Sequence, residues 1–308
     1  MTQINFFLIA LKGFALGLSM VLPGISGGTI AFIIGIYEKL IKEISNFKIK
    51  HIKNFMLCFS FNKKQIKTNF TVLKNSWDWT FLIPLMLGAF IALILFVSFA
   101  GDFIAQYSFE FYSIIFGLIV SSVIPTLRLA KKNLSFFLFL LGSFFLNFIL
   151  FAFGSQFISI NSELVSNSKE VSSLIFFPAG FLISMALIVP GISGSYLLLV
   201  LGLYEKTLFA LKSLNLFVIC IFIFGVLLGF LLTAKIIQKM LKKYWNQSLA
   251  VIIGLMLGSL YVVYPLEKSS LNDFLVFNKS QTLFLIYMLA GCICFLALHF
   301  SLTSQQKK

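Results

Sequence analysis

Long continuous runs of apolar residues follow one another along this chain, with short polar or basic segments between them. A bilayer core of about 30 Å requires roughly 20 apolar residues for each helical span. The strands of a membrane β-barrel would instead alternate apolar and polar residues over segments of about 10 residues. The pattern therefore predicts six spanning helices, at about residues 79–100, 110–127, 134–154, 215–233, 248–266 and 281–301.

Composition narrows the class of protein further. Of the 308 residues, 59% are hydrophobic and only 11% are charged, whereas a soluble domain carries about 25% charged residues. This excludes a soluble enzyme, a disordered chain and a secreted disulfide scaffold, and it predicts an all-α polytopic membrane protein. The net charge of +14 is typical of basic cytoplasmic loops, so nucleic acid is not expected as a partner.

Two further apolar stretches, at about 4–41 and 174–210, are each broken near the middle by Pro-Gly. Residues 13–39 have the sequence GFALGLSMVLPGISGGTIAFIIGIYEK, and residues 180–206 have GFLISMALIVPGISGSYLLLVLGLYEK. The two align without a gap at an offset of 167, with 11 of 27 positions identical. Chance similarity would not place PGISG and YEK at the same spacing, so the stretches are copies of one another.

The repeat extends beyond these copies at an offset of 137, through Gly88 and Gly117 in the first half and Gly225 and Gly254 in the second. We therefore divide the chain into an N-terminal repeat, residues 1–154, and a C-terminal repeat, residues 155–308. A longer basic loop at 42–76 in the first half accounts for the difference between the two offsets. We expect the halves to form one packed transmembrane unit.

The charges of the loops predict the orientation of the chain. The 42–76 loop carries eight lysines and one glutamate, so it should lie in the cytoplasm together with both termini. The loops at 101–109 and 155–173 are poor in bases and should lie outside. The second broken stretch must begin and end outside, because the span that follows it has to finish at the basic 234–247 loop. The halves then have opposite orientations, as in transporters built from inverted repeats.

An even number of crossings leaves two arrangements open for each broken stretch: a re-entrant helical hairpin or a pair of spans. After Gly28, only about 13 apolar residues remain before Lys42, and a helix of that length measures about 20 Å. This favours two inverted repeats, each with one Pro-Gly broken re-entrant hairpin and three transmembrane helices. The alternative is ten spans instead of six spans plus two hairpins.

The Pro-Gly-Ile-Ser-Gly sequence cannot continue a plain helix, because proline lacks an amide donor and its ring disrupts the preceding turn. A helix that starts near Ser26 to Thr29 leaves its first amides unpaired; serine or threonine can cap them, and such amides suit an anion. We expect the two turns to meet near mid-membrane and to form a neutral cradle for a phosphate. A tight hairpin, with glycines that only serve close helix packing, is the alternative. The candidate binding residues are Pro23, Gly24, Ser26, Gly27, Gly28 and Thr29 in the first copy, and Pro190, Gly191, Ser193, Gly194 and Ser195 in the second.

A Tyr-Glu-Lys sequence follows each copy and is a candidate gate, or a site of coupling to protons or sodium ions. Acids close to membrane depth are costly and usually serve a function. The alternative is that these are interfacial residues at a helix end, where lysine complements the helix dipole. The residues concerned are Tyr37, Glu38 and Lys39 in the first copy, and Tyr204, Glu205 and Lys206 in the second.

Two further basic residues are candidates for attracting a phosphate. Lys12 lies inside the first apolar run and could instead snorkel to the cytoplasmic surface. Arg128 is the only arginine and could grip phosphate with two hydrogen bonds, or it could be an ordinary positive-inside residue.

Nothing in the sequence points to catalysis. Residues 24–28 fit the hydrolase pattern G-x-S-x-G, but that motif requires a preceding strand and an acid and a histidine elsewhere. The only histidines are His51 and His299, and the preceding run is helical and apolar. We therefore expect no catalytic residue, no metal site and no cofactor.

The doubled Pro-Gly-Ile-Ser-Gly, followed each time by glycine, an apolar residue and Tyr-Glu-Lys, resembles the bacterial PopT family, previously a domain of unknown function. The resemblance covers about residues 5–301. It implies a multi-pass transporter of the bacterial cytoplasmic membrane that returns undecaprenyl phosphate, the lipid carrier of peptidoglycan and other envelope polymers, from the outer to the inner leaflet. It also implies that the carrier's phosphate binds at the Pro-Gly motifs. The second motif departs from the first by having Ser195-Tyr196 where the first has Gly28-Thr29.

The primary hypothesis is therefore a flippase for undecaprenyl phosphate, with the headgroup between the two turns and the isoprenoid tail among membrane lipids. A secondary transporter of a small soluble anion is the alternative, since an inverted repeat and helix-start amides fit it equally well. A site that opens sideways to lipid would favour the flippase.

Overall fold

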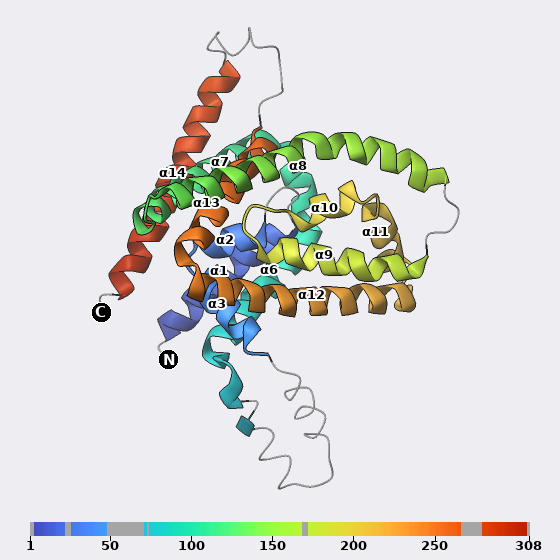
Figure 1. Ribbon diagram of the computed structural model, residues 1–308, viewed down its shortest axis with the longest axis horizontal. Coiled ribbons are helices and arrows are strands. Elements are labelled where there is room, and N and C mark those ends of the chain that lie inside the picture. Colours follow the sequence, from blue (N-terminus) through green and yellow to red (C-terminus); the bar gives the residue numbers. More distant parts are fainter. Residues whose placement is uncertain are drawn as a thin grey trace.

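The computed structural model describes residues 3–21, 26–47, 71–72, 74–167, 172–265 and 279–306. This part of the chain is helical and contains no strand, which confirms the predicted all-α class for the described residues (Figure 1). The helices, in chain order, are α1 (Gln3–Val21), α2 (Gly27–Ile33), α3 (Tyr37–Ser45), α6 (Trp79–Gln106), α7 (Ser108–Leu129), α8 (Leu134–Asn167), the 3-10 helix η1 (Ser173–Ile175), α9 (Phe176–Ile188), α10 (Gly194–Val200), α11 (Tyr204–Lys212), α12 (Leu216–Lys243), α13 (Trp245–Val263) and α14 (Lys279–Gln306).

Each of the six predicted spans coincides with a helix over most of its length, although the span predicted at 248–266 runs past the end of α13 at Val263. Among the described residues, five segments are long and apolar enough to cross a membrane: Ser108–Leu129, Leu134–Gly154, Leu216–Lys243, Trp245–Val263 and Ser280–Ala297. The remaining predicted span belongs to α6, which has 28 residues and a shorter apolar part, Trp79–Leu95. The chain is therefore a multi-pass membrane protein.

Several helices extend beyond the predicted spans, so the expected loops at 101–109, 155–173 and 234–247 are largely wrong. The most extended cases are α8, which continues to Asn167, and α12, which continues to Lys243. Residues 155–167 and 234–243 contain no glycine or proline that would stop a helix. The lysines in the last turn of α12 also stabilise the negative end of its dipole.

The helices pair in a pattern that is the same for the two halves. α1 packs along α6 and α9 along α12 within their own halves, whereas α7 packs along α14 and α8 along α13 across the halves. In Figure 1, α9 and α12 lie side by side. A Cβ atom on Gly88 would overlap the carbonyl oxygen of Ala10, and one on Gly225 would overlap that of Phe177. The same interhelical contact thus recurs at the offsets of the sequence repeat, and glycine permits the close approach.

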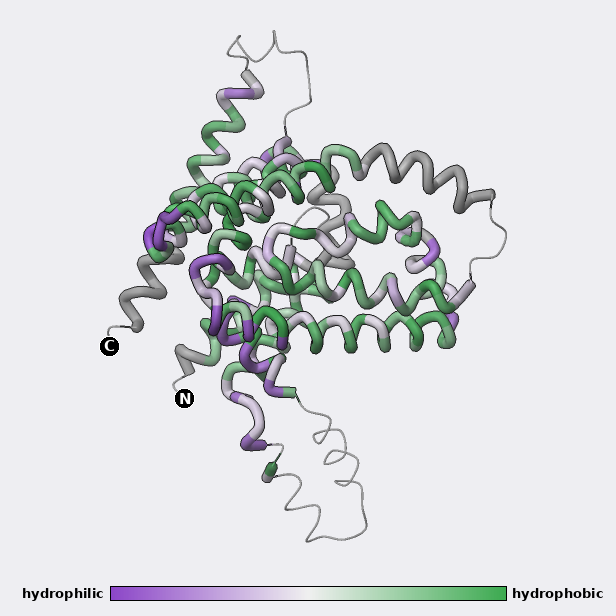
Figure 2. The backbone as a smooth tube through the Cα atoms, in the orientation of Figure 1, coloured by the Kyte–Doolittle hydropathy of each residue, from purple (hydrophilic) through white to green (hydrophobic). Residues whose placement is uncertain are grey.

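The outer surface of the bundle is apolar. Large hydrophobic side chains such as Leu138 on α8, Phe224 on α12 and Ile293 on α14 are exposed, while Ser113 and Asn147 are buried. Figure 2 shows hydrophobic stretches along α8, α9 and α12, with hydrophilic ones around α3 and the end of α12. This distribution is the one expected where the helices face lipid.

Each broken stretch contains one longer helix and two short ones. We call α1 to α3 the first broken segment and α9 to α11 the second. Helices α2 and α10 have seven residues each, about 10 Å, and α9 has 13, about 20 Å. Gly35 (φ 70°) and Gly202 (φ 67°) then separate the two short helices. The run after each Pro-Gly is therefore two helices and not one, because a residue at positive φ ends a helix.

Candidate functional site

The start of α2 touches the second Pro-Gly turn directly. The hydroxyl of Ser26 donates a hydrogen bond to the carbonyl oxygen of Val189 at 3.0 Å, and the amide of Gly191 donates one to Oγ1 of Thr29 at 2.7 Å. Ser26 and Thr29 are only 3% and 2% exposed. We call this set of four residues the tip junction. The structure thus brings the start of α2 and the second predicted turn together, and their polar groups bond to one another.

Both short helices begin where the sequence predicts. Ser26 and Ser193 occupy the N-cap positions, with extended backbone angles of φ −93°, ψ 132° and φ −90°, ψ 124°. The hydroxyl of Ser193 accepts a hydrogen bond from the amide of Tyr196 at 3.4 Å and lies 3.0 Å from that of Ser195. The side chain of Ser26 makes no capping bond, because its hydroxyl is directed at the other turn. The predicted capping therefore occurs in the second copy only.

The glycines of the first turn differ in how closely they are packed. A Cβ atom on Gly28 would overlap the carbonyl oxygen of Ile188, which lies in the second broken segment. On Gly27 the nearest atom would be the carbonyl oxygen of Leu187 at 3.6 Å, an ordinary contact. Gly28 is thus required by the close approach of the two turns, whereas Gly27 is not. Of the other predicted residues, Pro190 and Gly194 are buried, and Pro23 and Gly24 lie outside the described residues.

Asn147 of α8 holds the second turn in place. Its Nδ2 donates hydrogen bonds to the carbonyl oxygens of Gly191 at 2.9 Å and of Leu255 at 2.6 Å, and the residue is 1% exposed. Gly191 itself has a φ of 90°, and a Cβ atom there would overlap the carbonyl group of Leu255. The sequence analysis missed Asn147. The signal was a single amide side chain in the middle of a predicted span, where polar groups are costly.

Tyr37, Glu38 and Lys39 begin α3, so Lys39 does not lie at a helix C-terminus, where it would complement the dipole. Its Nζ lies 2.7 Å from Oδ2 of Asp78 and 4.4 Å from the centre of the Phe81 ring. Oε2 of Glu43 accepts a hydrogen bond from the amide of Asp78 at 3.0 Å. These contacts attach α3 to the start of α6. We call Lys39, Glu43 and Asp78 the α3–α6 clamp.

The clamp gives a pH-dependent prediction. The ammonium of Lys39, and then the hydroxyl of Thr80, hold the pKa of the Asp78 carboxyl below its ordinary value. A lowered pKa contributes stability above the unfolded value of about 3.9, and that stability is lost as the pH falls through the folded value. Asp78→Asn removes the charge but keeps a side chain that caps α6, where Oδ1 accepts from the amide of Phe81. We expect a cost below about 1 kcal/mol at pH 7, because the pair is partly exposed.

Melting temperatures of the wild type and Asp78→Asn in detergent, at pH 7 and at about pH 3, measure this effect. The difference between the two proteins should shrink at the lower pH, because the carboxyl of the unfolded chain is protonated below about 3.9 and the advantage of the ionised pair in the folded protein then falls. An equal difference at both values would mean that charge is not the cause.

The Tyr-Glu-Lys residues of the second copy begin α11 in the same way. Tyr204 is partly buried and packs against the cluster that contains Leu198 and Leu203. The side chain of Glu205 lies outside the described part of the chain. Arg128 is exposed in the last turn of α7. These residues do not join the tip junction.

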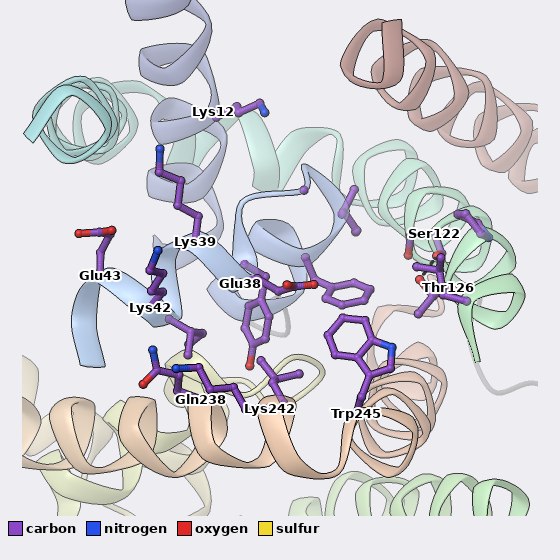
Figure 3. Close-up of a pocket in the computed structure, with 18 of the residues that line it drawn as sticks. Lys12, Glu38, Lys39, Lys42, Glu43, Ser122, Thr126, Gln238, Lys242 and Trp245 are labelled. Carbon is purple, nitrogen blue, oxygen red and sulfur yellow. Dashed lines mark hydrogen bonds between the residues drawn. The ribbon is translucent and has the colours of Figure 1, made fainter. Parts of the chain in front are cut away.

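A cavity of about 1300 Å³ lies beside α3 and is separate from the tip junction (Figure 3). Helix α2 connects the two places, because Ser26 precedes its first residue and Phe32 and Ile33 at its other end line the cavity. The further walls come from α1, α3, α7, α12, α13 and α14. Its charged lining residues are the lysines Lys12, Lys39, Lys42 and Lys242 and the acids Glu38, Glu43 and Asp78.

Comparison with known proteins assigns the chain to a family. The profile described as "VCA0040-like: Undecaprenyl phosphate translocase-like" matches residues 16–281. The chain belongs to this family. The match spans the tip junction, the α3–α6 clamp and most of the cavity, and it confirms the resemblance that the doubled motif indicates.

Two curated relatives match this translocase-like protein over most of both chains. A polyprenyl-phosphate transporter of Vibrio cholerae serotype O1 is 32% identical over 266 residues, which are 86% of this chain and 80% of the relative. A polyprenyl-phosphate transporter of Staphylococcus aureus is 30% identical over 266 residues, 83% of this chain and 85% of the relative. No solved structure matches the chain.

The sequence analysis of this family member did not predict a cavity beside α3. Its lysines on α3 and α12 have the pattern of ordinary positive-inside residues, and Gln238 has no distinguishing motif. The cavity exists because α3 packs against α12, from the other half of the chain. Only the tertiary arrangement brings Lys42 and Lys242 to one wall.

Proposed function

We propose that this protein transports polyprenyl phosphate and returns undecaprenyl phosphate from the outer to the inner leaflet of the bacterial cytoplasmic membrane, for reuse in cell-envelope synthesis. The names of the family and of both relatives support this substrate. The observation that carries the proposal is the tip junction, in which two helix breaks of a membrane protein meet in its buried interior.

The chemistry of the junction fits passage of a phosphate. Moving even one charged side chain to the centre of a bilayer costs at least about 2.5–3.5 kcal/mol. Serine and threonine hydroxyls and backbone amides of the two turns can replace the water that a headgroup loses. These groups bond one another in the closed junction, so the turns must part to admit the headgroup. The residues proposed for binding are those named from the sequence: Pro23, Gly24, Ser26, Gly27, Gly28 and Thr29 in the first copy, and Pro190, Gly191, Ser193, Gly194 and Ser195 in the second.

The proposed transport is by alternating access. The reciprocal helix pairing and the short length of α9 support two inverted repeats with re-entrant hairpins. With both termini and the 42–76 loop in the cytoplasm, the cavity beside α3 faces the inner leaflet. Separation of the turns from the other side would expose the junction to the outer leaflet. Glu38 and Glu205 are the proposed sites of coupling to protons or sodium ions.

Reconstitution in liposomes tests this function. A polyprenyl phosphate is placed in one leaflet, and its arrival in the other is followed by its accessibility to an added phosphatase. We expect transfer faster than in protein-free liposomes, and faster with a pH or sodium gradient of one sign. No acceleration under gradients of either sign would contradict the proposal. Uptake of inorganic phosphate without transfer of the lipid would instead identify a transporter of a small soluble anion.

A further inference from the structure

The hydroxyl of Tyr37 is buried at the wall of the cavity without a partner. Tyr37 is 3% exposed, packs edge-on against Phe32 with 5.8 Å between the ring centres, and lines the cavity. Its hydroxyl accepts or donates no hydrogen bond within the described part of the chain. A buried hydroxyl left unpaired loses its bonds to water without replacement. This unpaired hydroxyl, on a residue that lines the cavity, is a candidate hydrogen-bonding group for a ligand that enters the cavity.

Lysines from two helices line the same cavity. Lys42 lies on α3, directly after Ile41. Lys242 lies on α12, one turn after Gln238. Figure 3 shows Lys42 on α3, with Gln238 and Lys242 on the neighbouring helix α12. Neither lysine forms an ion pair with any residue that the structure describes. Both charges are thus available to a ligand.

The acidic residues of the cavity do not cancel these two lysines. Asp78 is paired with Lys39, and Glu43 bonds to the backbone of Asp78 in the clamp. Figure 3 shows Glu43 directed to the outer edge of α3, and Glu38 directed to the side of the cavity that carries Ser122 and Thr126. Lys12 lies at the opposite end of the cavity in the same view and adds a further positive charge.

We propose that Tyr37, Lys42 and Lys242 form a binding site for a phosphate monoester, with Gln238 as a further donor. At neutral pH such a group carries a charge between about −1.5 and −2 and offers three acceptor oxygens. Two ammonium groups match its charge, and a phenol and an amide match its acceptors. The site lies at the end of α2 opposite to Ser26, so it would hold the headgroup about 10 Å, one length of α2, from the tip junction. This inference rests on the proposed function for the source of the phosphate.

The test measures binding to the purified full-length protein by calorimetry. The probes are farnesyl phosphate, farnesol and inorganic phosphate. Tyr37→Phe and Lys242→Met should each weaken binding of farnesyl phosphate by about tenfold or more, since each removes a hydrogen bond to a charged group. Lys243→Met is the matched control: the neighbouring lysine lies over the ring of Tyr244 and not at the cavity. It should change binding by less than about twofold.

Stability separates a ligand role from a structural one. Tyr37→Phe removes a hydroxyl that has no partner in the described structure, so its melting temperature without ligand should equal or exceed that of the wild type. If Tyr37→Phe and Lys242→Met bind farnesyl phosphate with wild-type affinity, the proposed site is wrong. Water would then be the hydrogen-bond partner of the Tyr37 hydroxyl. Equal binding of farnesol would overturn the site as well.

The probes also distinguish the source of the phosphate. If inorganic phosphate displaces farnesyl phosphate and binds with similar affinity, the site is supported with free phosphate as its ligand. If farnesyl phosphate binds clearly more tightly than inorganic phosphate, the ligand is a lipid headgroup. The same variants are then assayed in the liposome experiment. Wild-type transport with unaffected binding in the variants would refute this site and leave the transporter in place. Variant-sensitive binding without any wild-type transport would refute the proposed function and support the site.

Discussion

Gly28→Ala is expected to reduce lipid transfer by about tenfold or more and to lower the free energy of unfolding by about 1–3 kcal/mol, the usual cost of an overpacked interior. The added methyl group would overlap the carbonyl oxygen of Ile188 and would lie 3.0 Å from the nitrogen of Pro190. Both are backbone atoms, so no side chain can move aside. The two turns must separate, and the hydrogen bonds of the tip junction are strained or lost.

Gly27→Ala is the matched control for this change. The substituted positions are adjacent and both lie in the first turn of α2. At position 27 the methyl group meets nothing closer than 3.6 Å, and alanine is favoured over glycine in a helix by up to about 1 kcal/mol. This variant should therefore be as stable as the wild type or more stable, and it should retain transport because alanine keeps the backbone amide that position 27 would offer to a headgroup. Denaturant unfolding in detergent and the liposome assay measure both effects. Equal losses of stability and transport at the two positions would mean that the effect comes from the start of helix α2 and not from contact between the turns.

Asn147→Leu is the second substitution with a large expected effect. It removes the donor that satisfies the buried carbonyl of Gly191, and leaving such a group unpaired costs about 1–3 kcal/mol. Asn147→Asp should cost at least as much, because a carboxylate would face the carbonyl oxygens of Gly191 and Leu255. Both variants should release the second turn and slow lipid transfer.

Ser143→Ala, one turn earlier on α8, is the control for Asn147. The hydroxyl of Ser143 bonds only to the carbonyl oxygens of Phe139 and Leu140 in its own helix. Those carbonyls keep their helical partners, so the change in unfolding free energy should stay within about 1 kcal/mol. If Asn147→Leu were as stable as Ser143→Ala, the amide would not be what positions the second turn.

The helices and the contact between the two turns could be predicted because their causes are local or repeated. Apolar length specifies each span, and PGISG specifies where α2 and α10 begin. The breaks at Gly35 and Gly202 were missed, although the glycines match in the alignment, because one glycine in an apolar run is compatible with a continuous helix. Their positive φ values depend on how α3 and α11 pack.

The supporting residues could not be predicted for a different reason. Asn147 acts on a turn that is 44 positions away in sequence, and Lys42 lines the same cavity as Lys242, which follows it by 200 positions. Periodicity and motif describe neighbours along the chain, whereas these roles arise from tertiary contacts. The charge pattern predicts an orientation of the lysines relative to the membrane, but it cannot show which of them line the same cavity.

The exchange of partners between the halves has a consequence for biogenesis. α7 packs along α14, which closes the described chain, and α8 packs along α13. A ribosome that has completed only the N-terminal repeat has therefore delivered two helices whose main neighbours do not yet exist. Insertion must leave these two helices without their main partners until the last segment is released. Co-expressed halves supply the missing partners to each other and should reconstitute the protein, whereas either half expressed alone should be cleared by membrane proteases.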